Sequence, residues 1–300
     1  MDDTSLFHRI DFANNVDAVS GIVRWNPLKS TWWFGMALGW VIMGSLYFSW
    51  SSVAVFIGFT ATTLCLGHSL GMHRKLIHES FECVPWLEKV MIWCGVLVGL
   101  GGPFTMMHMH DMRDWAQRQK NCHPFLSHQS SMTKDFWWQL HCKLHLVYPP
   151  NYHLPSKIAK DRFYQFLQQT SLLQQLLPGV VFYVLGGWGW VAWGICGRVT
   201  ISIFGHWLVG YHAHNIGSRD WHITGAAVQG YNVPAALLFS FGECWHNNHH
   251  AFPQSAKMGL YKGQIDPGWV VLKGLMRLGL VYNVKQPKDL PKRPELSRIS

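Results

Sequence analysis

The sequence is poor in charged residues, and those it has are unevenly distributed. Asp, Glu, Lys and Arg make up 14% of the 300 residues, against 49% hydrophobic residues, which is low for a soluble protein. Residues 30–73 contain none of the four. A helix needs about 20 apolar residues to cross a bilayer. This stretch therefore predicts two transmembrane helices joined by a tight turn near residues 49–52.

Three further features are missing. The seven cysteines include no CxxC pair, so we expect no disulfide framework and reduced thiols in a cytosolic environment. The first residues, MDDTSLFHRIDFANN, lack the basic start and apolar core of a signal peptide. No segment has the pattern of a flavin, nicotinamide or haem site. The net charge of +9 does not predict nucleic acid binding, because the basic residues flank the apolar runs.

A second uncharged region predicts a second helical hairpin. Residues 163–197 and 199–218 lack charge, and the segment GGWGWVAWGICG fits the far end of the hairpin, where aromatic rings sit at the membrane interface. The predicted fold is an all-α integral membrane protein, one domain over residues 1–300, with four transmembrane helices in two hairpins. The predicted spans are residues 31–49, 53–71, 176–195 and 199–216.

Basic residues indicate the orientation of these spans. Lys and Arg concentrate in residues 1–29, 74–162 and 257–300, and such segments face the cytoplasm in multi-pass proteins. We therefore expect a multi-pass protein with both termini and a histidine-rich cap in the cytoplasm, and Arg198 as the one basic residue on the far side. Residues 90–107 are expected to be re-entrant or interfacial. The cytoplasmic segments are then residues 1–30, 72–165 and 219–300.

The eighteen histidines suggest what the cap does. His246, His249 and His250 are spaced by three and four in HNNHHAFP, which puts them on one side of a helix. Neutral imidazoles that converge form metal sites. The alternative is a polar helix end whose histidines meet only water.

Two other segments bring histidines to the same side of the membrane. His73 and His78 follow the first hairpin, and their spacing of five allows both to bind one ion only if the helix ends or distorts there. His214 lies at the end of the second hairpin. His68, His206 and His212 are expected to be structural.

These motifs resemble the membrane fatty acyl desaturases, and most closely the stearoyl-CoA delta-9 type. The resemblance covers roughly residues 30–285 and includes GECWHNNHHAFP and the segment SAKMGLYKGQIDPGWVVLKGLMRLGLVYNV. It implies a histidine-ligated di-iron centre, O2 as co-substrate, an acyl-CoA or acyl-lipid substrate that gains a cis double bond, and a separate ferredoxin-like or cytochrome-type electron donor. The implied iron ligands are His73, His78, His214, His246, His249 and His250.

The second histidine box of that family departs from its pattern here. The family has H-R-x-H-H after an Arg-Asp pair, and counting from that pair places Trp115, Arg118 and Gln119 at the histidine positions. An Arg beside two cations is electrostatically unfavourable. Nearby donors are therefore candidate replacements. They are His108, His110, Asp114, His123, His128, His141 and His145. The alternative is a site rebuilt for one metal, or one that no longer works.

Two sets of charged residues have predicted supporting roles. Asp111 and Glu243 are candidates to accept the outer N–H of metal-bound imidazoles, and exposed surface charge is the alternative. A second set could receive an anionic headgroup or orient the protein on an acidic membrane. It consists of Arg74, Lys75, Lys157, Lys160, Arg162 and Lys262.

Other functions stay open at this point. A related non-haem iron hydroxylase would insert oxygen in place of removing the second hydrogen. A non-catalytic homologue or metal-binding scaffold would keep the fold without the reaction. A metal transporter is disfavoured, because the histidines cluster at one membrane face and line no path across it.

Overall fold

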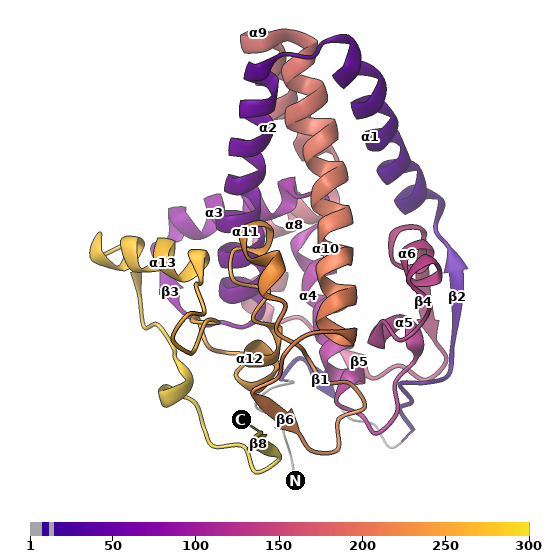
Figure 1. Cartoon of the computed structure of the whole chain (residues 1–300), viewed down its shortest axis with the longest axis vertical. Coiled ribbons are helices and arrows are strands. Elements are labelled where there is room, and N and C mark those ends of the chain that lie inside the picture. The colour runs from indigo at the N-terminus through magenta and orange to yellow at the C-terminus, as the bar shows by residue number, and fades with distance from the viewer. Residues whose placement is uncertain (1–7, 12–14, 300) are drawn as a thin grey trace.

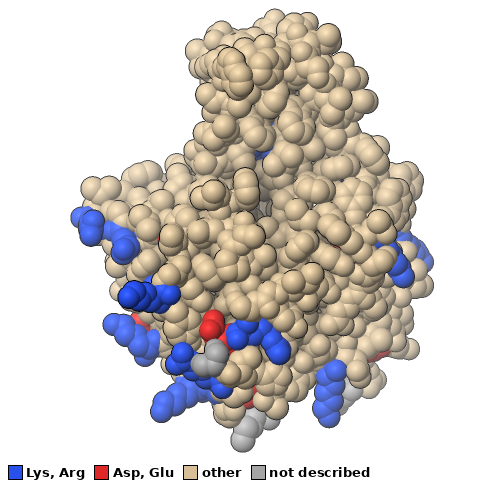
Figure 2. All heavy atoms as spheres, viewed as in Figure 1, with Lys and Arg blue, Asp and Glu red and all other residues tan. Residues whose placement is uncertain are grey.

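A helical arm projects from a broader cap in the computed structural model, which describes residues 8–11 and 15–299. The arm consists of α1 (Pro27–Leu46), α2 (Trp50–Thr62), α9 (Leu176–Val191), the π-helix η3 (Ala192–Gly197) and α10 (Arg198–Asn215). On the face drawn in Figure 2, Lys, Arg, Asp and Glu lie on the cap and almost none lies on the arm. The helices of the arm contain only two charged residues, Lys29 and Arg198, so the charge of the chain is concentrated in the cap.

The first hairpin of the arm ends in an unusual helix. Asn26 caps α1 through its side chain, and Ser49 caps α2 in the same way after a short turn. Instead of ending at Thr62, α2 continues as the π-helix η1 (Thr63–Ile77) down into the cap. The combined helix, Trp50–Ile77, has 28 residues and is apolar enough to cross a membrane.

The second hairpin reverses earlier than the sequence predicted. Residues Leu173–Asn215 form one run of helical segments that is long and apolar enough to cross a membrane. Gly187, which has a φ of 65°, breaks this run into two legs. A Cβ at Gly194, after the break, would lie 2.7 Å from Phe182, before it. The two legs therefore pack against each other with the turn at Gly187. The predicted spans 176–195 and 199–216 placed this turn some ten residues too late.

Arg198 is not on the far side of the arm, as predicted, but inside the protein. Its side chain is fully buried and donates hydrogen bonds to the carbonyls of Gly194 and Leu97 and to the side chain of Gln175. The guanidinium also lies 4.8 Å from the ring centre of Phe59. A cation with this many partners can be buried without an opposite charge. Arg198 joins the returning helix to the cap.

Among the described residues, two helices are long and apolar enough to span a membrane, Trp50–Ile77 and Leu173–Asn215. The fold is mostly helical, as predicted, but four crossings stay a prediction. Residues 90–107 do not form one helix, because α3 (Pro85–Leu97) and α4 (Pro103–Gln117) are separated by a turn with Gly99 at a φ of 92°.

The cap is not purely α-helical. In the part of the chain that the structure describes, eight short strands form four two-stranded antiparallel sheets, β1–β5, β2–β4, β3–β7 and β6–β8. The longest sheet pairs Gly21–Trp25 with Cys142–Leu146. The strands are β1 (Ile10–Asp11), β2 (Gly21–Trp25), β3 (Glu82–Cys83), β4 (Cys142–Leu146), β5 (Asn151–Tyr152), β6 (Trp221–Ile223), β7 (Val281–Tyr282) and β8 (Leu296–Arg298).

Short helices make up the rest of the cap. They are α5 (Pro124–Ser127), α6 (Met132–His141), α7 (Ser156–Ala159), α8 (Arg162–Gln169), η2 (Leu173–Gln175), η4 (Pro234–Ala236), α11 (Leu237–Ser240), α12 (His246–Ala251), α13 (Pro267–Arg277) and η5 (Pro287–Asp289).

The cap holds the long helices through tight backbone contact. A Cβ at Gly67 would lie 2.3 Å from the backbone of Cys94, and one at Gly71 would lie 2.6 Å from the carbonyl oxygen of Met91. Only glycine permits η1 to lie this close to α3. The lower end of η1 is thereby fixed beside α4 and α12, where the histidines meet.

Candidate metal centre

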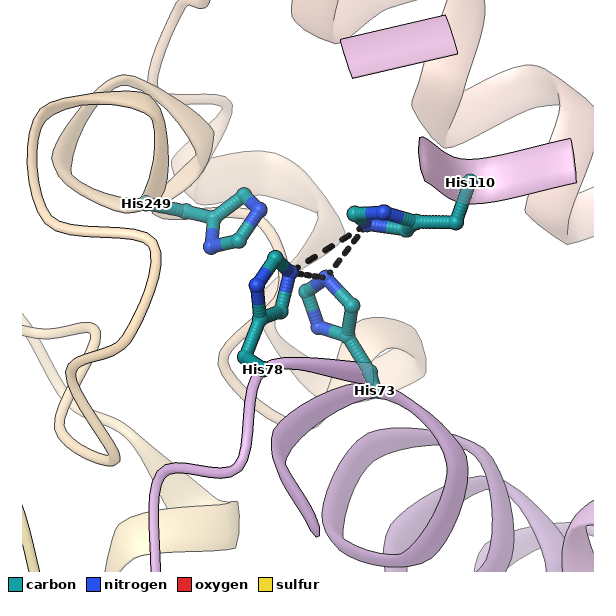
Figure 3. A group of neighbouring side chains, drawn as sticks. All are labelled: His73, His78, His110 and His249. Carbon is teal, nitrogen blue, oxygen red and sulfur yellow. Dashed lines mark hydrogen bonds between the residues drawn. The ribbon is translucent and has the colours of Figure 1, made fainter. Parts of the chain in front are cut away.

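Four imidazoles from three segments converge in a first group, defined as His73, His78, His110 and His249. The Nε2 atom of His73 lies 3.1 Å from that of His110 and 3.2 Å from that of His78, and the Nε2 atoms of His78 and His110 are 3.3 Å apart. All four rings point toward one another (Figure 3), and their nearest nitrogen atoms lie within 4.8 Å of one another. This arrangement can hold a metal ion.

The π-helix explains how a spacing of five serves this group. In η1 the backbone N–H of His78 donates to the carbonyl of His73 at 3.0 Å, the five-residue hydrogen bond that defines a π turn. His73 and His78 therefore lie one turn apart on the same side of the chain, which an α-helix would not allow. The predicted distortion is confirmed, and π turns are frequent at functional sites.

Three imidazoles form a second group, His214, His246 and His250. The Nε2 atom of His246 lies 3.1 Å from that of His214 and 3.0 Å from that of His250. Nδ1 of His214 lies 2.7 Å from the carbonyl oxygen of Gly210, so this nitrogen carries the proton and Nε2 has a free lone pair. The second group can also hold a metal ion.

Helix α12 belongs to both groups. His246 and His250 are four residues apart and face the second group, while His249, between them, turns to the first. The ring centres of His249 and His73 are 4.5 Å apart, and those of His249 and His246 are 5.7 Å apart. The two groups are therefore neighbours.

Burial keeps four of these imidazoles neutral. It lowers the pKa of His78, His246 and His249 well below the ordinary value and that of His250 to about 4. Neighbouring imidazoles add to the effect, because two positive rings in contact would repel each other. At neutral pH each of these four rings offers a lone pair, the form that binds a metal.

Glu243 lies directly behind the first group. Its Oε2 atom is 2.5 Å from Nδ1 of His73, and its Oε1 atom accepts a hydrogen bond from Ser69 at 2.6 Å. Burial would raise the pKa of Glu243, but His73, Arg74 and Ser69 hold it at about 2. An ionised carboxylate here orients the His73 ring and fixes its tautomer, the position that the sequence predicted for Glu243.

Asp111 does not have the corresponding position. Its Oδ2 atom lies 2.5 Å from Nε of Arg9, and Oδ1 accepts a second bond from the same guanidinium at 3.0 Å. Nδ1 of His110 is 4.0 Å from Asp111, too far for a hydrogen bond. The predicted role of Asp111 as an imidazole partner is wrong, because the carboxylate is paired with Arg9.

The second histidine box has a different register from the predicted one. Trp115 is fully buried in the hydrophobic core with Met112 and Phe125, and the side chain of Gln119 donates to the carbonyl of Trp115. His110 is the residue of α4 in the first group. Reading H-R-x-H-H from His110 places Arg113 and Asp114 at the second and third histidine positions. The box therefore keeps one histidine.

Arg118 and four of the seven replacement candidates are not members of the two groups. Arg118 donates to the carbonyl of His250 at 3.1 Å. His108 packs against Tyr152, and His123 caps α5 by accepting from the backbone N–H of Phe125. His141 is buried with Nδ1 2.9 Å from Ser30, and His145 is exposed on β4.

His128, another candidate replacement ligand, belongs to neither group and instead forms part of a buried network behind the second group. His128 stacks on His214 with ring centres 5.3 Å apart. Nδ1 of His128 lies 2.8 Å from Asp135, and Nε2 accepts from Arg113 at 2.9 Å. Both nitrogens are thus occupied, and burial and Arg113 together lower the pKa of His128 to about 4. The only sequence signal was the presence of Arg113 where the family box has histidine.

The predicted headgroup residues divide into three kinds. Arg74 is fully buried, 3.0 Å from Asp266 and 2.7 Å from the carbonyl oxygen of Ala256, so its predicted role is wrong. Lys75 is 3.0 Å from Glu88. Lys157, Lys160, Arg162 and Lys262 are exposed.

The histidines expected to be structural lie outside both groups. His68 and His206 face each other with ring centres 4.9 Å apart, and His212 belongs to neither group.

Comparisons with known proteins agree with this site. No family model matches the chain. The sn-1 stearoyl-lipid 9-desaturase of Anabaena variabilis is 34% identical over 79% of this chain and 85% of its own length. The sn-1 stearoyl-lipid 9-desaturase of Synechocystis is 33% identical over 81% of this chain and 74% of its own length. Delta-9 acyl-lipid desaturase 2 of Arabidopsis thaliana is 32% identical over 84% of this chain and 80% of its own length. The chain belongs to the fatty acyl desaturase family.

Proposed function

We propose that the two histidine groups each hold one iron ion, and that the chain uses this pair to desaturate the acyl chain of a membrane lipid. The observation that carries the proposal is the convergence of seven imidazoles from η1, α4, α10 and α12. They are buried or partly buried and arranged in two adjacent groups, which fits a pair of ions. The iron ligands proposed are His73, His78, His110 and His249 for the first group, and His214, His246 and His250 for the second.

The reaction sets what the chain must supply. An acyl –CH2–CH2– unit and O2, with two electrons and two protons, become –CH=CH– and two water molecules. Bound iron supplies the redox chemistry that breaks two unactivated C–H bonds, which no side-chain acid or base can do. The electrons come from a separate protein of the ferredoxin-like or cytochrome class.

The chain's own residues hold and shield the site. Glu243 orients His73, and the Gly210 carbonyl orients His214. A small hollow beside the first group is lined by residues that include His78, Asp114 and Arg118. It offers water and small molecules a path from the cap surface. The acyl chain reaches the groups from the opposite side, along the apolar arm.

The arm is the proposed membrane domain, with α1, α2, α9 and α10 as four crossings and the cap on the cytoplasmic side. On the face drawn in Figure 2 the arm shows almost no charged side chains, which supports this placement. The first and last strands, β1 and β8, both lie at the cap end (Figure 1). The prediction for the N-terminus itself concerns residues 1–7, which lie outside the described residues.

A lipid-linked acyl chain is the proposed substrate. The relatives reported above are named acyl-lipid desaturases, whereas the sequence resemblance pointed first to the stearoyl-CoA type. Other relatives of similar identity are named acyl-CoA desaturases. Of the six basic residues predicted to receive a headgroup, Arg74 is buried and Lys75 is paired with Glu88. These six residues therefore do not form a dense basic site for the phosphates of CoA.

The test is expression in a cell of simple lipid composition, with an electron donor supplied, followed by mass spectrometry of intact lipids and of acyl-CoA. Wild type should add an acyl species with two fewer hydrogens in the lipid fraction. His249→Ala should abolish it, and His153→Ala, an exposed histidine of the cap, should not. A product with one added oxygen would replace the proposal with a hydroxylase, and matching wild-type and His249→Ala profiles would contradict both.

A further inference from the structure

The two histidine groups are unequal, and the missing donor of the second group has a candidate in the structure. The first group offers four imidazoles and the second three. A tetrahedral or larger coordination sphere needs at least one more ligand, which water or a further side chain can supply. A further side chain has to come from an element that lies beside both groups, and α4 does so, because it carries His110 of the first group and Arg118 at its end donates to the carbonyl of His250.

Asp114 lies one helical turn after His110 on the same side of α4. Its Oδ2 atom is 3.8 Å from Nδ1 of His110, and its side chain is only 18% exposed. It shares the hollow beside the groups with His78. One turn further along, Arg118 at the end of α4 donates to the backbone carbonyl of His250 at 3.1 Å, so the same side of α4 reaches the second group. Asp114 thus lies on α4 between a residue of the first group and a residue that contacts the second.

Arg113, the other residue at a histidine position of the box, is turned away. Its Nη1 atom donates to Nε2 of His128 at 2.9 Å, and Nη2 donates to Gln139 at 2.8 Å. His128 cannot bind an ion in this arrangement, because its Nε2 lone pair is taken by Arg113 and its Nδ1 faces Asp135. These contacts leave Asp114 as the donor that α4 presents to the second group.

We propose that Asp114 is the carboxylate ligand of the second ion, so that the centre pairs a four-imidazole site with a site of three imidazoles and one carboxylate. The inference rests on the metal centre of the proposed function. A carboxylate is a hard, negatively charged ligand. It offsets part of the ion's charge, which four neutral imidazoles do not. The two sites would therefore differ in net charge when both are occupied, which would favour different oxidation states of the two ions.

The competing role for Asp114 is to accept the Nδ1–H of His110 without touching a metal. Both roles need a carboxylate at this position, so loss of activity alone would not separate them. They differ in what is lost when the carboxylate is removed. If Asp114 is a ligand, its removal causes loss of the second ion. If it is an outer partner of His110, its removal weakens binding of the first ion and leaves the second ion bound.

The experiment counts and types the ions in the purified full chain in detergent, reconstituted anaerobically with isotopically enriched ferrous iron. Metal per chain comes from mass spectrometry of the elements, and the two environments come from Mössbauer spectroscopy. Wild type should hold two ions with two distinct signals. Asp114→Asn should retain one ion and lose the signal of the second group. Asp114→His should regain two ions, with two more similar signals.

Asp111→Asn is the matched control, because it removes a buried carboxylate from the same helix and should keep both ions. Retention of two ions with unchanged signals in Asp114→Asn would overturn the inference. So would a change in the first group's signal alone, which would make Asp114 an outer partner of His110. If wild type holds no iron, the proposed function fails and this inference with it. Two ions in wild type and in Asp114→Asn would contradict only the inference.

Discussion

The two histidine groups share a helix but are supported in different ways. The first group is backed by an ionised carboxylate, Glu243, and has four imidazoles. The second has three and is backed by a backbone carbonyl and by the ring of His128, which is held by Asp135 and Arg113. The comparison teaches that the two halves of a paired centre can be held by different kinds of contact, an ionised carboxylate in one half and a backbone carbonyl with a stacked imidazole in the other.

The largest expected effect follows from removing one imidazole of either group. We expect His78→Ala and His250→Ala each to abolish the desaturated product, because both ions are required. The two variants should differ in metal content, each losing the ion of its own group and keeping the other. Elemental analysis and Mössbauer spectra of the two proteins would show this. Loss of both ions in both variants would mean that the groups form one inseparable site.

Replacing the carboxylate behind the first group should have a smaller effect. Glu243→Gln keeps the shape but removes the charge that orients His73, and loss of such a partner typically weakens metal binding about 10–100-fold. The second group should bind its ion as before. Competition with a chelator of known affinity measures both sites. The proposed support is contradicted if Glu243→Gln weakens the two sites equally.

A still smaller effect is expected behind the second group. Asp135→Asn keeps an oxygen that can accept from Trp207 but removes the charge beside His128. Loss of a hydrogen bond to a charged group costs about 1.5–3 kcal/mol. Because His128 contacts His214 by stacking alone, binding of the second ion should weaken only a few-fold. Thermal unfolding and the chelator assay measure the two effects, with Asp161→Asn, a helix cap remote from the groups, as control.

The sequence predicted the parts of this centre that depend on local spacing. His73, His78 and His214 were placed correctly at the cap ends of long apolar helices, because the ends of uncharged runs are visible in the sequence. The distortion near His78 was also predictable, since a spacing of five fits no α-helical side. The resemblance supplied the family, which the comparisons confirm.

Other parts depend on contacts between distant segments. The turn at Gly187 could not be chosen from the several glycines of that region, because helix packing rather than composition selects the break. The register of the second box was misread, since only the fold shows that Trp115 enters the core and that His110 enters the first group. Burial of Arg198 and Arg74 was likewise missed, because their carbonyl and carboxylate partners lie far away in the chain.

The smallest expected effect concerns pH, and it separates the supports of the two groups. The pKa of His128 is lowered from 6.5 to about 4 by burial and Arg113, so between these values the unfolded chain binds a proton that the folded chain does not. Stability therefore falls as pH drops through this window. The pKa of Glu243 is lowered from 4.5 to about 2, so the stability it contributes is lost only below pH 4.5.

We therefore expect the unfolding temperature of the metal-free protein to decrease from pH 7 to pH 5. His128→Asn should show a smaller decrease than wild type, because one proton-binding group of the unfolded state is removed. Glu243→Gln should show the full decrease, since its window lies lower. Burial also lowers the pKa of other histidines, such as His78 and His249, so they contribute to the decrease as well. Only the difference between the two variants identifies the contribution of His128. Equal slopes in His128→Asn and wild type would mean that His128 is already protonated in the folded protein and that Arg113 lies elsewhere.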